Sequence, residues 1–382
     1  MAESDQYARL AADSVKLIAW NQHPEGGYIA SPLFSHYAFS WLRDGSFIAY
    51  GMDCAGEHDS SLQFYEWVRT IMERKLPHIA CLVGKHYRGE RIEQHEFLHT
   101  RYHLDGRDDE HSEWGHFQMD GYGTWLWGLC EHLKATGHTS LPERFRAAVD
   151  ASVQYVEAFW GYPNFDCWEE YPDNLHPSTL ACLYGGLRAI AELGGRTDLD
   201  ELCDTIQSFL LKYTVHEEGH FVKRVYPSYE QNGLVYRHGD EGVDASLLWL
   251  CEPFRVFEPS HPAMVATVCK VEAELRTSQG GVRRYVGDSY YGGGEWLLLT
   301  AWYGWCALRQ GRREVAEQAL EWIASKSDRL GRLPEQVPDA LPDRVAYDDW
   351  VRRWGPPATP LLWSHGMYLV LYNKLKQSKP ES

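Results

Sequence analysis

The sequence predicts an all-α fold, an (α/α)6 barrel in which six outer and six inner helices alternate along the chain. One set of segments is amphipathic, with apolar residues at spacings of three and four, as for Val149, Val153 and Val156. A second set, such as 296–308, is apolar on nearly every side, and a helix of that kind is buried on every side. The two sets take turns along the whole chain, as outer and inner helices do in a barrel of helical hairpins.

The order of these segments assigns each helix of the barrel. The amphipathic segments predict outer helices near 6–22, 58–80, 142–160, 198–213, 261–276 and 313–326. The apolar segments predict inner helices near 45–54, 120–137, 177–194, 244–251, 294–310 and 360–374. No low-complexity segment or linker interrupts the alternation, so residues 1–382 are predicted to form a single domain that ends in a polar tail at 375–382.

Composition narrows the class of partner. The chain has 382 residues, of which 44% are apolar, enough for a large core, and its formal net charge is −17. Such a charge argues against nucleic acid and against anionic membrane surfaces, because both select basic patches. No apolar run approaches the length that spans a bilayer. The 16 Trp and 23 Tyr suit a core and equally the apolar faces of sugars.

Cysteine usage and the N-terminus indicate the compartment. Nine cysteines are scattered without a C-x-x-C pair, which is typical of reduced thiols and not of a disulfide framework or a zinc knuckle. Residues 1–5 are neither basic nor apolar, so no signal peptide is expected. The sequence therefore predicts a cytoplasmic protein, and because nothing in it indicates a dimer interface, a monomer is expected.

Distinctive polar clusters lie just before the inner helices. In chain order they are Trp41–Asp44, Trp114–Asp120, Trp168–Glu170, His238–Gly242, Arg283–Tyr285 with Asp288–Gly294, and Leu333–Gln336. In a barrel of hairpins, the loops that enter the inner helices all open on one rim. The clusters are thus predicted to converge on a single cavity rich in Trp, Tyr, Arg and carboxylate, which favours an enzyme over an inert helical scaffold.

The adjacent carboxylates Glu169 and Glu170 have the makings of a general acid. Two neighbouring glutamates repel if both ionise, and an apolar neighbour such as Trp168 disfavours the charged form by desolvation. Both effects favour one protonated carboxyl near neutral pH. The alternative is a pair of solvated loop carboxylates, since charged residues are mostly exposed.

At these residues the chain resembles glycoside hydrolase family 15, the glucoamylase family, and within it the intracellular isomaltose glucohydrolases. Tyr37–Asp44 is similar to the first family block, and Trp114-Gly115-x-x-Gln118-x-Asp120 is similar to the second. Trp168-Glu169-Glu170 resembles the third block. Arg284-Tyr285, with Tyr290, Tyr291 and Trp296, and then Leu333-Pro334-Glu335-Gln336 resemble the blocks that follow.

The resemblance implies a role for each of these residues. It implies that Glu169 is the general acid, with Trp114 beside it, and that Glu335 is the general base. Glu170 would contact the leaving sugar. The resemblance also implies substrate-binding roles for Tyr37, Trp41, Arg43, Asp44, Trp168, Arg284 and Trp296.

The implied reaction is hydrolysis of a glucoside with inversion. Glu169 would protonate the leaving oxygen, and Glu335 would deprotonate a water on the opposite face of the sugar, with no cofactor and no metal. Inversion needs room for that water, so the two carboxyls are expected roughly 6.5–9.5 Å apart. Pro334 fixes its own φ and restricts Leu333, which would hold the base in place. The product would be β-glucose.

Two departures from the family bear on the substrate. Bacterial members commonly carry an N-terminal β-sandwich domain, whereas the helical pattern here starts at Gln6. The family is often secreted and acts on starch, yet no export signal is predicted. A small oligosaccharide with an α-1,6 linkage, such as isomaltose, is therefore the expected substrate. An α-1,4-preferring glucoamylase, an α,α-trehalase, a sugar 2-epimerase working through paired His, and a non-catalytic sugar-binding protein remain alternatives.

Several of these residues have simpler interpretations. Arg43 and Asp44 would also make a salt bridge at a helix start, where Asp is a favoured N-cap. Trp41, Trp114 and Trp296 would also serve as core. His95–His99 matches the H-E-x-x-H zinc pattern, which requires both His on one helix. Because Arg101–Gly106 has the pattern of a strand and a turn and not of a continuing helix, a zinc protease is disfavoured.

Overall fold

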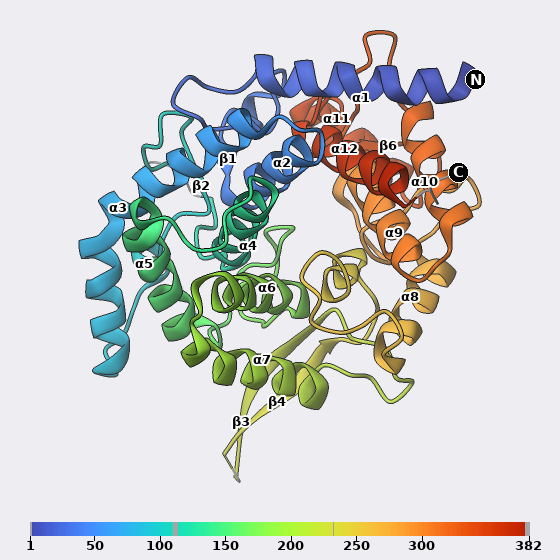
Figure 1. The fold of residues 1–382 in the computed structure, drawn as a ribbon. Helices are drawn as coiled ribbons and strands as arrows, with labels where there is room; N and C mark the ends of the chain where they lie inside the picture. Colours follow the sequence, from blue (N-terminus) through green and yellow to red (C-terminus); the bar gives the residue numbers. More distant parts are fainter. Residues whose placement is uncertain (1, 110–113, 232, 379–382) are drawn as a thin grey trace.

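The computed structural model describes residues 2–109, 114–231 and 233–378, most of them helical (Figure 1). The α-helices are α1 (Ala2–Trp20), α2 (Leu42–Cys54), α3 (His58–Tyr87), α4 (Asp120–Ala135), α5 (Glu143–Phe159), α6 (Pro177–Gly194), α7 (Asp200–Tyr213), α8 (Pro262–Glu274), α9 (Leu297–Arg309), α10 (Arg313–Ser325), α11 (Arg344–Trp354) and α12 (Leu362–Gln377). The 3-10 helices are η1 (Ser35–Tyr37), η2 (Gln94–Glu96), η3 (Thr197–Leu199), η4 (Ala245–Leu250) and η5 (Tyr290–Gly292). Three antiparallel pairs contain all the named strands: β1 (Ser40–Trp41) with β2 (Arg101–Tyr102), β3 (Arg224–Glu230) with β4 (Gly233–Asp240), and β5 (Glu295–Trp296) with β6 (Gln336–Val337).

A closed ring of helices lies at the centre of the molecule. The elements α2, α4, α6, η4, α9 and α12 each pack on the next, and α12 returns to α2. Around them lie α1, α3, α5, α7, α8 and α10, with α1 crossing the outside of α12 beside α10 (Figure 1). This is the predicted (α/α)6 barrel.

The inner helices approach one another closely because glycines lie at their contacts. A Cβ on Gly51 of α2 would be 2.5 Å from the carbonyl oxygen of Gly366 in α12. A Cβ on Gly186 of α6 would be 2.4 Å from the carbonyl oxygen of Gly123 in α4. Side chains cannot come that near, so these positions require glycine. The outer helices bury one side only, as in α10, where Ala316, Ala319 and Ile323 face inward.

A five-residue turn recurs where the chain leaves an outer helix for the rim. In each copy the first residue donates its N–H to the carbonyl of the fifth, and a glycine at the fourth position donates to the carbonyl of the first. The copies are 23–27, 103–107, 216–220, 277–281 and 328–332. The fourth glycine has positive φ in every copy, from 74° in Gly331 to 111° in Gly26, a conformation that glycine adopts without strain.

The residue three places after this turn is held in the rim by a shared backbone pattern. The N–H groups of Ala30, Lys223 and Glu335 donate to carbonyls that shortly precede the next inner element, those of Phe39, Gly242 and Ala358. The carbonyls of Ala30, Arg284 and Glu335 accept from the first residues of α12, η4 and α9. The repeat therefore presents one residue of each copy at the same level of the barrel; in the second copy that residue, 110, lies outside the described residues.

The structure departs from the predicted helices in a few places. The predicted inner helix at 244–251 is a 3-10 helix, η4, and Pro253, which has no N–H to donate, follows soon after it. The predicted outer helix at 58–80 extends to Tyr87 as α3. The first residues of the predicted polar tail 375–382 form the last turn of α12, and residues 379–382 lie outside the described residues.

Two elements were not predicted at all. The hairpin of β3 and β4 projects from the edge of the barrel beyond α7 (Figure 1). Its strands are largely exposed, so they lack the apolar alternation that marks a half-buried strand. The helix α11 has no fully buried residue, although Tyr347, Trp350, Val351 and Trp354 follow helical spacing in its otherwise polar segment.

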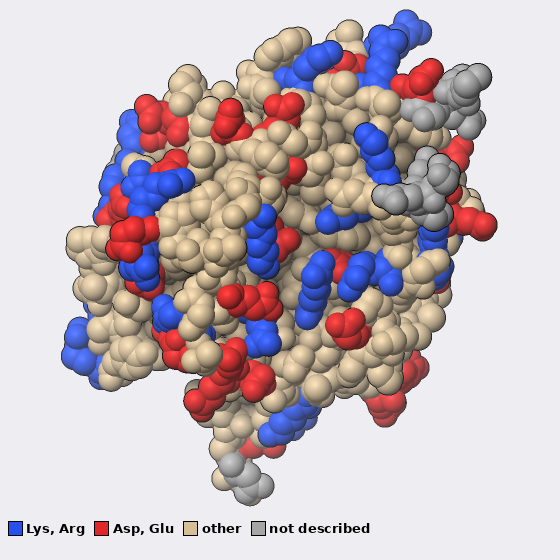
Figure 2. All heavy atoms as spheres, in the orientation of Figure 1, with Lys and Arg blue, Asp and Glu red and all other residues tan. Residues whose placement is uncertain are grey.

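Surface charge and the thiols match the composition. Acidic and basic side chains are interspersed over the face seen in Figure 2. All nine cysteines are free. Within the described residues, no helix has both the length and the apolar character needed to cross a membrane.

Candidate active site

All of the predicted site residues line a single cavity of about 410 Å³, a size suited to a small ligand. They are Tyr37, Trp41, Arg43, Asp44, Trp114, Trp168, Glu169, Glu170, Arg284, Trp296 and Glu335. Each comes from a loop before an inner element or from the first turn of that element. Five of the six predicted clusters therefore converge on this cavity; the fourth, His238–Gly242, contributes no residue to its wall, so that part of the prediction is wrong.

Glu169 lies in the connection between α5 and α6, in a turn at 166–170 that makes the same two backbone hydrogen bonds as the five-residue turn, with Glu169 at the position of the glycine. Its φ is 67°, in the left-handed region that residues with a Cβ seldom adopt. The carboxylate of Asp166 stabilises this turn, because its Oδ1 accepts the N–H of Trp168 at 2.9 Å and that of Glu170 at 2.8 Å. The N–H of Glu169 bonds the carbonyl of Asp166 at 3.0 Å. Backbone strain held by surrounding contacts is common at functional sites.

The two adjacent glutamates have separate partners. Glu169 Oε1 accepts from the indole N–H of Trp41 at 2.7 Å and from the amide of Gln118 at 3.1 Å. Glu170 Oε2 accepts from the hydroxyl of Tyr285 at 2.6 Å, and its Oε1 lies 3.5 Å from Arg284 Nη2. The alternative of solvated loop carboxylates is wrong, because both side chains are engaged in the cavity.

Glu335 is buried between two phenols. Its Oε1 accepts from Tyr37 at 2.9 Å and its Oε2 from Tyr290 at 3.2 Å, and the two hydroxyls are 2.7 Å apart. Burial raises the pKa of Glu335 to about 7, while the hydrogen bond from Tyr37 and the charge of Arg284 lower it. The backbone is fixed as well, since Ser364 donates to the carbonyl of Pro334 at 2.8 Å.

Arg43 and Asp44 form the floor of the cavity with a buried charge network. Arg43 Nη1 donates to Asp120 Oδ2 at 2.8 Å and to Gln118 Oε1 at 3.0 Å, and its Nε lies 3.6 Å from Asp44 Oδ2. Burial raises the pKa of Asp44 to about 7, although Arg43 opposes the rise and Glu169 adds to it. The interpretation of Asp44 as an N-cap is wrong, because α2 begins at Leu42 and Asp44 is in its first turn.

Several polar atoms that line the cavity are left for a ligand. In the described structure the indole nitrogen of Trp296 is buried without a hydrogen-bond partner, and Arg43 Nε and Asp44 Oδ2 are buried with only the 3.6 Å ion pair to each other. Unsatisfied buried groups of this kind are rare and call for an explanation. Hydroxyl groups of a sugar would satisfy both the donors and the acceptor.

Arg284 brings a fixed positive charge to one wall. Its Nε and Nη2 bond both oxygens of Asp288, at 2.7 Å and 2.5 Å, a bidentate arrangement that fixes the guanidinium plane. The same guanidinium lies 5.2 Å from the ring centre of Trp168 and 5.5 Å from that of Trp296. These tryptophans therefore belong to the cavity wall, as does Trp41, whose ring centre is 6.1 Å from that of Trp114.

Comparison with known proteins agrees with this site. The family described as Glycosyl hydrolases family 15 matches residues 6–337. The chain belongs to this family. It is 38% identical to the isomaltose glucohydrolase of Kribbella flavida over 98% of this chain and 95% of that protein.

Solved structures give the same result. A glycosidase variant in complex with glucose is 37% identical, with a TM-score of 0.91 over 98% of both chains. A bacterial glucoamylase complexed with acarbose, 17% identical, has a TM-score of 0.72 over 96% of this chain and 55% of the other, and it supports the fold. The protein is therefore a glycoside hydrolase built as an (α/α)6 barrel.

Some residues of this family 15 cavity were missed by the sequence reasoning. Trp350 and Trp354 line it from α11, and Trp363 from α12. Trp350 lies 4.9 Å from the ring of Tyr290, and Trp354 stacks 3.9 Å from the ring of His36. The spacing of four between Trp350 and Trp354 in an otherwise polar segment was the available signal, since it puts both rings on one helical face.

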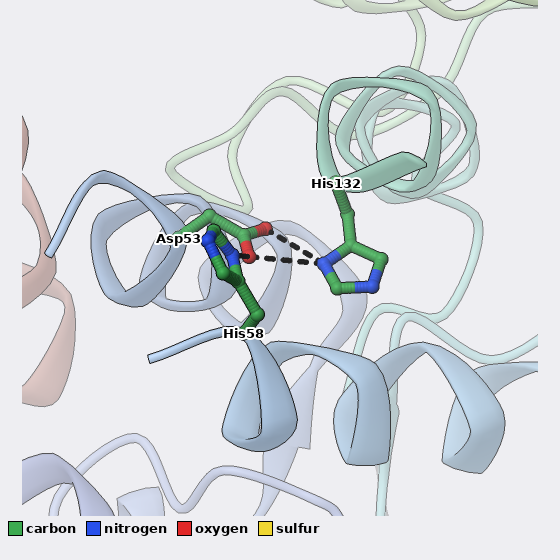
Figure 3. A group of neighbouring side chains, drawn as sticks. All are labelled: Asp53, His58 and His132. Carbon is green, nitrogen blue, oxygen red and sulfur yellow. Dashed lines mark hydrogen bonds and ion pairs between the residues drawn. The ribbon is translucent and has the colours of Figure 1, made fainter. Parts of the chain in front are cut away.

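The described residues include two groups that could hold a metal ion, and neither is part of the cavity wall of this family 15 enzyme. In the first, His58 and His132 both turn Nδ1 toward Asp53, at 2.8 and 2.9 Å from Oδ1, which makes a hydrogen-bonded tie between α2, α3 and α4 (Figure 3). The second, His216, Glu218 and His220, belongs to the third copy of the turn.

The H-E-x-x-H match has no helix to support it. His95 lies in η2, which ends at Glu96, and the chain then passes into β2. The two histidines therefore do not share a helical turn, and the zinc-protease alternative is excluded. The strand predicted after this segment is confirmed.

Proposed function

We propose that the protein is an inverting exo-acting glucosidase that releases β-glucose from the non-reducing end of small α-glucosides, with isomaltose as the preferred substrate. The observation that carries this proposal is the pair of glutamates, Glu169 and Glu335, that line one cavity with separate sets of hydrogen-bond donors. The α-1,6 linkage is supported by the Kribbella flavida relative, which is an isomaltose glucohydrolase, because isomaltose is an α-1,6-linked disaccharide.

Glu169 suits the part of general acid. Both of its neighbouring donors, Trp41 and Gln118, reach Oε1, so the transferable proton belongs on Oε2. That proton would pass to the glycosidic oxygen as its bond to the sugar breaks. The strained turn fixes where Oε2 points, and positioning of this kind contributes much of an enzyme's rate.

Glu335 suits the part of general base. It must be ionised to take a proton from water, and Tyr37 and Tyr290 donate to its two oxygens, which favours the ionised form. Ser289 and Trp350 line the same cavity as Glu335. The water would attack the face opposite the leaving oxygen, which yields β-glucose from an α-glucoside.

The sugar would be held by polar atoms that make no hydrogen bond within the described structure. Arg43 Nε and Asp44 Oδ2 would bond hydroxyls of the terminal glucose, with tryptophan rings against its apolar faces. Glu170, Tyr285 and Arg284 would form the side that receives the leaving sugar. A cavity of about 410 Å³ with Trp350 and Trp354 in its wall suits a short substrate better than a polymer.

Two measurements test this function. Turnover of isomaltose, maltose, trehalose and dextran is compared under one set of conditions, and we expect isomaltose to have the highest kcat/KM. Proton NMR within minutes of mixing should detect β-glucose first. Early α-glucose would reject inversion, and a preference for maltose or trehalose would reject the linkage.

The alternative of a sugar 2-epimerase needs paired histidines at the rim. Among the described residues that line the cavity there is no histidine, which disfavours that chemistry. Mass spectrometry separates the two, because hydrolysis adds a water to the substrate mass and epimerisation does not. A non-catalytic sugar-binding protein would bind isomaltose without release of glucose.

We also propose that the barrel acts as a single-domain monomer in the cytoplasm, on small oligosaccharides imported by the cell and without a membrane or nucleic-acid partner. The nine free thiols and the interspersed surface charges support this. Light scattering after size exclusion should give the mass of one chain, and a dimer mass would contradict the proposal.

A further inference from the structure

Lys223 occupies the same position in the repeat as two residues of the active site. It lies three places after the turn 216–220, as Arg284 follows 277–281 and Glu335 follows 328–332. Its N–H bonds the carbonyl of Gly242 at 2.9 Å, the equivalent of the bond that Glu335 makes to Ala358. The barrel therefore directs Lys223 toward the centre of the rim.

The ammonium of Lys223 is buried and makes no hydrogen bond within the described structure. The residue is 4% exposed, and Nζ lies 3.7 Å from Asp244 Oδ2 and 2.7 Å from the ring centre of Tyr285. A buried cation costs free energy unless it is paired. Such a group is retained where its charge serves a purpose.

Two contacts of Lys223, with Tyr285 and with Asp244, lead to residues of the cavity wall. Tyr285, over which the ammonium lies, donates its hydroxyl to Glu170 at 2.6 Å. Asp244, its ion-pair partner, accepts from the indole N–H of Trp168 at 2.9 Å. Lys223 thus contacts Tyr285 and Asp244, which hydrogen-bond the side chains of Glu170 and Trp168.

We propose that Lys223 is a positioning residue that sets the affinity for the leaving sugar by holding Tyr285 and, through it, Glu170. This inference rests on the proposed function, because it assigns Glu170 to the leaving-sugar side. The ammonium attracts the face of Tyr285 and fixes the direction of its hydroxyl. It also offsets the negative charges of Glu170, Asp166 and Asp244, which lie together on this side of the cavity.

The test compares two substrates that differ in the leaving group. Lys223→Met keeps the length of the side chain and removes its charge. With isomaltose we expect KM to rise about tenfold, the effect of losing roughly one hydrogen bond. With α-glucosyl fluoride, which has no leaving sugar, KM and kcat should stay within about twofold of wild type. The fluoride also serves as a control, because a general loss of fold would lower activity on both substrates alike.

Two further variants control this experiment. Lys223→Arg keeps the charge and should recover part of the affinity for isomaltose. Lys212→Met removes an equivalent lysine that lies over a tyrosine, 4.6 Å from the ring centre of Tyr213 on an outer helix, and should change neither substrate. If Lys223→Met does not fold, Lys223→Arg is compared with wild type, because arginine keeps the charge but places it differently over Tyr285. A rise in KM for isomaltose alone would then support the role of Lys223, and an unchanged KM would overturn it.

The outcomes separate this inference from the proposed function. An unchanged KM for isomaltose in Lys223→Met, or an equal loss with both substrates, would overturn the role of Lys223 and leave the hydrolase intact. A wild-type enzyme that fails to hydrolyse isomaltose but hydrolyses another α-glucoside would overturn the substrate, and Lys223 would then be tested with that substrate.

Discussion

Glu169 and Glu335 line the same cavity, yet the barrel holds them by different means. Glu335 follows a regular copy of the five-residue turn, and its backbone makes the bonds that recur around the rim. Glu169 lies inside a turn of the same hydrogen-bond pattern, 166–170, at the fourth position, where the other copies have glycine and Glu169 has a φ of 67°. One carboxylate lies three places after the turn, and the other lies inside it, at the position that is glycine in the other copies.

The two carboxylates also differ in burial and in how their oxygens are hydrogen-bonded. Glu335 is 3% exposed, and a phenol bonds each of its oxygens. Glu169 is less buried, and both of its donors bond Oε1. Donors to both oxygens help to keep a base ionised, whereas an acid needs one oxygen free to carry a proton. The fold therefore provides a rigid site for the base and a locally constrained, asymmetric site for the acid.

The largest expected effect separates the two roles. Glu335→Gln should lower kcat about 10²–10⁴-fold with isomaltose, the usual range for loss of an acid or base, and equally with α-glucosyl fluoride. Glu169→Gln should lose as much with isomaltose but retain most activity on the fluoride, because fluoride leaves without a proton. Steady-state kinetics with both substrates measures this. Equal losses for Glu169→Gln on both substrates would contradict its assignment as the acid.

A smaller effect is expected from loss of Asp166, whose carboxylate supports the turn 166–170 around Glu169. Asp166→Ala removes the acceptor for the N–H groups of Trp168 and Glu170, so Glu169 should move from its place, and displacement by about 1 Å can cost on the order of 10²-fold in kcat. Asp166→Asn retains an acceptor oxygen and should recover most of the rate. The kcat of both variants with isomaltose is the measurement; equal activity of Asp166→Ala and wild type would show that the turn needs no such support.

The phenol beside Glu335 should set the pH dependence. Burial raises the pKa of Glu335 to about 7 and the hydrogen bond from Tyr37 lowers it, so Tyr37→Phe should raise this pKa further. A base works only when ionised; kcat/KM should therefore rise with pH through about 7 in wild type, and this acidic limb should move to higher pH by about one unit in the variant. Tyr290→Phe, whose bond is longer at 3.2 Å, is the matched comparison and should shift it less. A shift to lower pH would contradict the assignment.

The sequence predicted most of the barrel and the residues of the cavity, for physical reasons that also explain the omissions. Inner helices that are apolar on all sides and outer helices that are apolar on one side leave a strong periodic pattern. The exposed hairpin of β3 and β4 leaves no such pattern. Helix α11 has apolar residues at helical spacing, but it lies outside the alternation of six outer and six inner helices, so Trp350 and Trp354 were missed. The positive φ of Glu169 accompanies Asp166, which stands three places before it as in other copies of the turn, but the contacts of Glu169 with Trp41 and Gln118 are not encoded by any local pattern.

The recurring turn also leaves a signal in the sequence, although it was not among the predicted features. A side chain that accepts a backbone N–H stands three places before a glycine in several copies, as in His216 and Gly219, Thr277 and Gly280, and Asp328 and Gly331. Aligning these copies places Lys223 at the same position as Arg284 and Glu335. The alignment does not supply the partner of Lys223, because Tyr285 comes from another copy.

The smallest expected effect concerns the neighbour of the acid. Tyr285→Phe removes the hydroxyl that bonds Glu170 at 2.6 Å, so the carboxylate is less well fixed and KM for isomaltose should rise by roughly three- to tenfold, with kcat little changed. The fluoride substrate should be unaffected, since it makes no contact on the leaving-sugar side. If kcat fell as steeply as KM rose, Glu170 would take part in the chemical step and not in binding alone.

The same variant also tests the connection to Lys223. If the lysine acts through the phenol, the double variant Lys223→Met with Tyr285→Phe should raise KM for isomaltose little more than either change alone, because both remove one shared contact. Independent residues would instead multiply their effects. A multiplied effect would mean that Lys223 reaches the leaving sugar by way of Asp244 and Trp168, and Asp244→Asn would then be expected to reproduce the loss seen in Lys223→Met.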